Sequence, residues 1–139
     1  MKSILVGVDG SPESRKAADY AAQIALATHS RLELAHVMPE IAEMGAKSMY
    51  TFSSVPVQTD RAQTMLHELS HSVPRGLTPV DTVLLEGNPA QVLADEAKQA
   101  DVWLVVVGHR GRSPLERALI GSVADRLTQL CPKPLMVVR

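Results

Sequence analysis

Five short apolar runs, separated by segments of helical period, constrain the fold of this 139-residue chain more than any other feature. The runs are nearly continuous in Val, Ile and Leu, a pattern typical of strands that are covered on both faces. No hairpin signal joins neighbouring runs. The five expected strands are residues 2–8, 31–37, 81–86, 102–107 and 135–139.

Helical signals fill the intervals between these runs. Ser11 is placed to cap a helix that continues in alanines at three- and four-residue spacing. Residues 60–73 have an apolar face of helical period, Asn88 begins a third helix that reaches about residue 99, and Ser122 is placed to cap the last helix. Residues 40–58 show neither period, and we expect them to form a long connection of the kind that often closes over a site.

Strands that alternate with helices predict an α/β fold, a doubly wound parallel sheet with helices on both faces. The length is that of one domain, so residues 1–139 are expected to share one fold. The run at 102–107 is the most apolar and is expected at the centre of the sheet. Ligands of such sheets bind outside the carboxyl ends of the strands, where the winding direction reverses.

Composition excludes several classes of protein. The net charge of −1 gives no electrostatic argument for nucleic acid, and no apolar run is long enough for an integral membrane protein. Cys131 is the single cysteine, so an internal disulfide framework is excluded. The first residues lack an export signal, and we expect a cytoplasmic protein.

Glycine and arginine dominate the segment after the fourth apolar run, GHRGRSPLERALIGSVADR. Its spacing is Gly-x2-Gly-x9-Gly-Ser, formed by Gly108, Gly111, Gly121 and Ser122. Glycines at 108 and 111 allow positive φ and let an anion approach backbone N–H groups, while Gly121 and Ser122 present the start of a helix to the same anion. With Asp9 at the end of the first strand, this segment is expected to form a phosphate-binding crevice.

The chain resembles the ATP-binding subgroup of the universal stress protein family. The resemblance covers the whole length, from ILVGVDGS through LELAHV and EGNP to VVVGHRGRSPLERALIGSVADRL and CPKPLMVV. It implies an adenine nucleotide alpha hydrolase-like fold of five parallel strands in the order 3-2-1-4-5. It also implies a stress-response module that binds ATP, or ADP or AMP.

Site residues follow from the same resemblance, position by position. Asp9 would lie near the nucleotide and hold a divalent cation such as Mg2+, Val37 would line the adenine, and Gly87 would form the floor. No catalytic residue is assigned. The residues that the resemblance places around the nucleotide are Val8, Asp9, Val37, Gly87, Gly108, His109, Arg110, Gly111, Gly121, Ser122 and Val123.

Other readings of the motifs stay open. His67-Glu68-Leu69-Ser70-His71 matches the His-Glu-x-x-His pattern of zinc peptidases, but the helical period turns both imidazoles away from the apolar face. The glycine segment lacks the lysine of a P-loop, so we expect binding with slow hydrolysis at most, and not an enzyme. The alternatives are a weak ATPase or adenylate-processing enzyme, and a dimeric scaffold that binds no nucleotide.

The last apolar run, residues 135–139, predicts an assembly. As the terminal strand of a sheet it would expose unpaired backbone groups, which invite pairing with another chain. Antiparallel pairing with its own copy would form a homodimer. An unidentified protein partner would then recognise the nucleotide-bound dimer.

Overall fold

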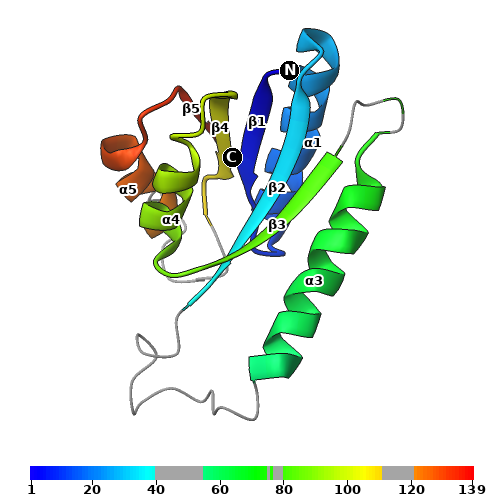
Figure 1. Ribbon diagram of the computed structural model, residues 1–139, viewed down its shortest axis with the longest axis vertical. Coiled ribbons are helices and arrows are strands. Elements are labelled where there is room, and N and C mark those ends of the chain that lie inside the picture. The colour runs from blue at the N-terminus through cyan, green and yellow to red at the C-terminus, as the bar shows by residue number, and fades with distance from the viewer. Residues whose placement is uncertain (40–54, 75, 77–79, 111–120) are drawn as a thin grey trace.

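The computed structural model describes residues 1–39, 55–74, 76, 80–110 and 121–139. Its core is one five-stranded sheet in the order β3-β2-β1-β4-β5, and every neighbouring pair is parallel (Figure 1). The predicted fold class and strand order are therefore confirmed. The fourth run, predicted at the centre, forms β4, which lies between the central strand β1 and the edge strand β5. The strands are β1 (Ser3–Gly7), β2 (Arg31–Met38), β3 (Val80–Glu86), β4 (Val102–Gly108) and β5 (Leu135–Val138).

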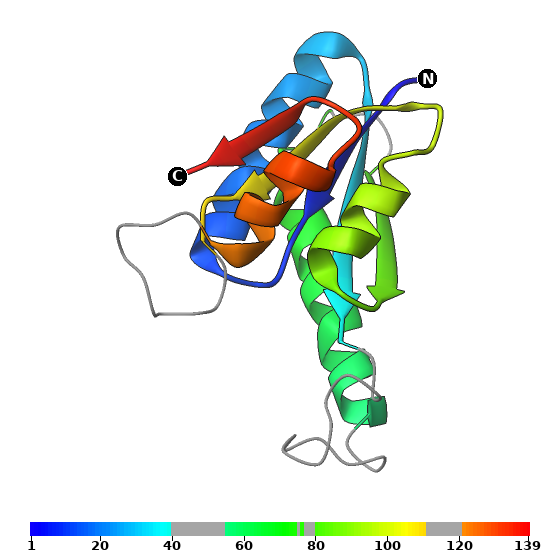
Figure 2. The same ribbon diagram turned by 90° about the vertical axis from the view of Figure 1, so that its left-hand side faces the viewer.

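Helices cover both faces of the sheet. Figure 2 looks onto α4 (Pro89–Glu96) and α5 (Ser122–Leu130), with α1 (Pro12–Thr28) and α3 (Val55–Ser72) behind the strands. The winding moves from β1 outward to β3 and then returns to β4 and β5 on the other side of β1. The carboxyl ends of β1 and β4 consequently meet at the point where the winding direction reverses.

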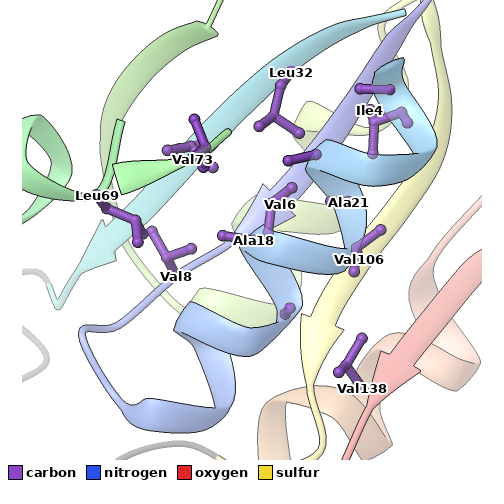
Figure 3. Packing of buried hydrophobic residues seen from close by; sticks show 14 of the residues in the cluster. Ile4, Val6, Val8, Ala18, Ala21, Leu32, Leu69, Val73, Val106 and Val138 are labelled. Atoms are coloured by element: carbon purple, nitrogen blue, oxygen red, sulfur yellow. The ribbon is translucent and has the colours of Figure 1, made fainter. Parts of the chain in front are cut away.

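The core beneath α1 depends on small residues. Ala17, Ala18, Ala21 and Ala25 on α1 have no exposed surface, which lets the helix axis lie close to the sheet. Ile4 and Val6 of β1 and Leu32 and Leu34 of β2 belong to the same cluster, as do Val106 and Val138. α3 closes this cluster with Leu66, Leu69 and Val73 (Figure 3). Alternate residues of the same strands, Leu5 and Val105 among them, pack against α4 and α5 on the other face.

Two helix boundaries differ from the predictions by several residues. α3 begins at Val55, five residues before the predicted start, although Pro56 interrupts the apolar period there. Proline is tolerated in the first turn of a helix because its missing N–H has no intrahelical acceptor at that position. α4 ends at Glu96 rather than near residue 99, because the amides of Lys98 and Gln99 bond three residues back, to Asp95 O and Glu96 O. The covering connection was predicted over residues 40–58. Of these, 55–58 belong to α3, and 40–54 lie outside the described residues.

None of the described helices combines the length and the apolar character that a membrane span needs.

Candidate functional site

The two segments predicted to form a crevice leave the sheet at the carboxyl ends of β1 and β4. Gly7 pairs with Val107, so Asp9 and His109, each two residues further on, leave the sheet side by side. The turn at Asp9 leads into α1 (Figure 1), and α5 is the next described helix after His109 in the sequence. The structure therefore brings together the two segments that the sequence places around one ligand.

Asp9 is fixed in its turn by hydrogen bonds. The Ser11 amide donates to Asp9 Oδ1 at 2.9 Å, and the Asp9 amide donates to Ser14 Oγ at 3.2 Å. Gly10 has a φ of 82°, which the tight turn requires and which glycine adopts without strain. Ser11 is the predicted N-cap of α1, since its side chain accepts from the Ser14 amide at 3.1 Å. Asp9 thus presents a partly buried carboxylate at a rigid position.

Both backbone polar groups of Val8 form hydrogen bonds with residues of β2. Its N–H donates to Ala35 O at 2.8 Å, and its C=O accepts from Nδ1 of His36 at 2.7 Å. His36 was not among the predicted site residues, although it is a polar residue in the run LELAHV and comes directly before Val37. That position was the available signal, because a polar residue in a buried run needs a hydrogen-bond partner.

Val37 and Gly87 lie at the carboxyl ends of β2 and β3. The side chain of Val37 is 9% exposed and packs in the cluster beneath α4 and α5. Gly87 is buried, donates from its N–H to Met38 O at 2.8 Å and has a φ of 134°. Both predicted residues are therefore at the edge that carries Asp9, and the φ of Gly87 explains why glycine occupies that position.

Gly108 serves a different purpose from the one predicted. Its φ lies outside the positive range, because it is the last residue of β4 and is extended. A Cβ at this position would lie 2.9 Å from the carbonyl carbon of Glu13, in the first turn of α1. Gly108 is needed because β4 and α1 approach closely, so the prediction of a left-handed residue is wrong here. Gly111 lies outside the described residues.

The main chain of His109 joins three elements of the site. Its N–H donates to Val138 O, at the end of β5, and its C=O accepts from the Gly121 amide, both at 2.6 Å. Arg110 follows with a half-buried side chain. These bonds place the start of α5 directly beside the carboxyl end of β4.

α5 begins without a side-chain cap. Gly121 is the N-cap residue and Ser122 the first helical residue, so the prediction that Ser122 caps the helix is wrong by one position. The Asp125 amide bonds to Gly121 O at 2.9 Å, which leaves the amides of Ser122, Val123 and Ala124 without intrahelical acceptors. Such an N-terminus, with its positive dipole end, favours an anion.

Comparison with known proteins gives a consistent result. A family model described as the universal stress protein family matches residues 1–139. Universal stress protein YxiE of Bacillus subtilis is 30% identical over 98% of this chain and 97% of its own length. A universal stress protein solved in complex with cAMP superposes with a TM-score of 0.77 at 24% identity, covering 99% of this chain and 97% of the other.

The universal stress protein from Archaeoglobus fulgidus in complex with dAMP has the same fold, with a TM-score of 0.69 at 17% identity. That match covers 100% of this chain and 98% of the other. The whole-length family match and the strand order agree with each other. This chain belongs to the universal stress protein family.

Proposed function

We propose that this chain binds an adenine nucleotide, ATP in the first instance, in the crevice between the Asp9 turn and the start of α5. The observation that carries the proposal is the N-terminus of α5, which lacks a side-chain cap and lies beside the end of β4. The relatives solved with cAMP and dAMP support the class of ligand.

The residues of the crevice fit the parts of a nucleotide. Amides of Ser122 and Val123 and the exposed Ser122 hydroxyl would hold phosphate oxygens. The strand ends at Val8 and Val37 would contact the adenine, with Gly87 beneath it and Arg110 near the phosphates. A carboxylate beside phosphates is a typical partner of Mg2+, so Asp9 would hold this ion when ATP is bound.

Substitution of Ser122 tests the phosphate position. Ser122→Asp should weaken ATP binding by about tenfold or more, because unit charges about 4 Å apart repel by about 1–4 kcal/mol. An aspartate in the first turn interacts favourably with the helix dipole, so the melting temperature should not fall. Isothermal titration with ATP, ADP, AMP and cAMP in the presence of Mg2+ measures the binding.

Ser122→Asn is the matched control, because it has nearly the same shape as Ser122→Asp and no charge. It should bind ATP clearly more tightly than Ser122→Asp, because its side-chain amide can still donate to a phosphate oxygen. Equal ATP affinities of the two variants would put the phosphates elsewhere. Absence of binding by folded wild-type protein would overturn the proposed function itself.

His36 should support the site through the Val8 carbonyl. His36→Leu leaves this buried acceptor without its donor, at a cost in stability of about 1–3 kcal/mol, and frees the peptide before Asp9 to move. His36→Asn keeps an N–H near the position of Nδ1. We expect the leucine variant to bind ATP more weakly than the asparagine variant, in titrations done where both are folded. ATP affinities equal to the wild type in both would contradict this role.

The nucleotide is proposed to act as a regulatory ligand rather than as a substrate. Asp9 Oδ1 already accepts a turn hydrogen bond, and the glycine segment has no P-loop lysine, so hydrolysis is expected to be slow at most. Multiple turnovers that depend on Asp9 and Mg2+ would favour the ATPase alternative. Limited proteolysis that is unchanged by ATP would contradict a regulatory change of conformation.

β5 is the proposed dimer interface. It is an edge strand in the described sheet, and three of its four residues are only partly buried. Antiparallel pairing of two copies would satisfy its outer backbone groups. Sedimentation at the mass of one chain, at micromolar concentration, would contradict the homodimer.

A further inference from the structure

Two histidines lie one turn apart on the outer surface of α3. His67 and His71 are both exposed, and their ring centroids are 4.2 Å apart. Leu66, Leu69 and Val73 face the other way, into the core. The pair therefore stands on the solvent side of a helix whose opposite side is fixed to the sheet, as the helical period predicts.

A hydrogen bond orients one ring for metal coordination. Nδ1 of His71 donates to the carbonyl oxygen of His67 at 2.8 Å. This bond places the proton of neutral His71 on Nδ1 and leaves the lone pair on Nε2, the nitrogen that points away from the helix backbone. Metal-binding histidines commonly donate their other ring N–H to a backbone carbonyl in this way.

We propose that His67 and His71 form a two-imidazole chelate for a divalent transition-metal ion of the Cu2+, Ni2+ and Zn2+ class. Imidazole nitrogens suit these ions, and residues four apart on a helix lie on the same face. Among residues 1–39, 55–74, 76, 80–110 and 121–139, no group of three or more His, Cys, Asp or Glu side chains could hold a metal. Water molecules complete the coordination, and the site is a binding site rather than a peptidase centre.

The surface beside His67 has room for these water molecules. A hollow of about 380 Å3 between α3 and β3 is lined by His67 together with Gln63, Ser70 and Thr82, whose side chains carry oxygen atoms, and by Leu66 and Leu84. Oxygen atoms of this kind can accept hydrogen bonds from metal-bound water. The hollow lies along the outer edge of the sheet, separate from the crevice at the ends of β1 and β4.

Binding at this pair has a mechanical consequence. The ion joins two side chains across the turn of α3 that also contributes Leu69 to the core. Because the chelate geometry exists only while this turn is helical, the ion binds the folded chain and stabilises it by mass action. The free energy of unfolding of the chain, and with it the packing of α3 on the sheet, should therefore increase with metal concentration.

Titration of the metal-free full chain with CuCl2, NiCl2 or ZnCl2 tests the proposal. We expect one ion per chain at this site, affinity in the order Cu2+ > Ni2+ > Zn2+, and a rise in melting temperature with metal. His67→Gln and His71→Gln should each weaken binding by about tenfold or more. His29→Asn removes another exposed histidine, the C-cap residue of α1, whose left-handed backbone conformation asparagine also adopts. This variant should leave metal binding unchanged.

A rescue experiment separates the chelate from nonspecific effects. Gln63→His, added to His71→Gln, places an imidazole four residues before His67 and should restore the lost affinity. Metal binding that is the same in the wild type and in both glutamine variants would overturn the proposal. So would an affinity lost equally in His29→Asn.

Discussion

Gly108→Ala is expected to lower the free energy of unfolding by about 1–3 kcal/mol, the usual cost of overpacking a well-packed site. The new Cβ would lie 2.9 Å from the carbonyl carbon of Glu13 and 3.1 Å from its oxygen. These are backbone atoms of the first turn of α1, so the helix start or the end of β4 has to move. Urea denaturation measures the loss, and nucleotide titration measures the effect on the adjacent Asp9 turn.

Gly7→Ala is the matched control for this prediction. Its Cβ would come even closer to a neighbour, 2.7 Å from Cδ1 of Leu93, but that atom is the far end of a flexible side chain. Both glycines belong to strands and neither has a positive φ, so backbone strain does not separate them. We expect the smaller loss for Gly7→Ala, because a methyl group can move where a backbone cannot. A larger loss for Gly7→Ala than for Gly108→Ala would contradict this account.

The fold could be predicted because its signals are local. Buried parallel strands are short apolar runs, and Ser11 and Asn88 mark helix starts through side-chain caps that form as expected, accepting from the amides of Ser14 and Gln91. The start of α3 could not be predicted in the same way. Proline at position 56 is a helix breaker in one context and a first-turn residue in another, and only the three-dimensional placement of the chain decides between them.

The placement of the segments around the candidate site was predicted more accurately than the contacts that their residues make. The topology brings Asp9 and His109 together, which follows from strand order alone. The reason for glycine at 108 depends on a contact with Glu13, 95 positions earlier in the chain, and a single sequence does not show such a contact. The role of His36 is similar, since its acceptor, the Val8 carbonyl, lies 28 positions earlier in the chain, just after β1.

Glu33, near the amino end of β2, shows the same limit of prediction from a single sequence. In the sequence it is an ordinary charged residue of the run RLELAHV. In the structure it is only 8% exposed, and its Oε1 has no hydrogen-bond partner among the described residues. Burial raises the pKa of Glu33 above its usual 4.5, and the carboxylates of Glu96, Asp101 and Asp81 raise this pKa further. Arg31 is the nearby cation that lowers it.

Arg31 is therefore expected to stabilise the folded state through these carboxylates, by an amount that depends on pH. Its Nη2 lies 2.5 Å from Asp101 Oδ2, and its Nε lies 3.3 Å from Asp81 Oδ2, the residue that pairs with Glu33 across the strands. Arg31→Gln removes this charge from among the carboxylates. Because the arginine side chain is one-third exposed, we expect a loss of about 1–2 kcal/mol at neutral pH, between the values for surface and buried pairs.

The sign of the pH dependence follows from the raised pKa of Glu33. A folded state that binds this proton more tightly than the unfolded state gains stability below pH 4.5 and loses it as the pH rises through the folded-state pKa. The loss caused by Arg31→Gln should therefore shrink as the pH falls toward 4.5. Glu33→Gln should be more stable than the wild type at neutral pH, and in its background Arg31→Gln should cost less. Urea denaturation of the four proteins at both pH values measures these differences, and a cost of Arg31→Gln that is the same at both would show that the charge of Glu33 is not the reason for it.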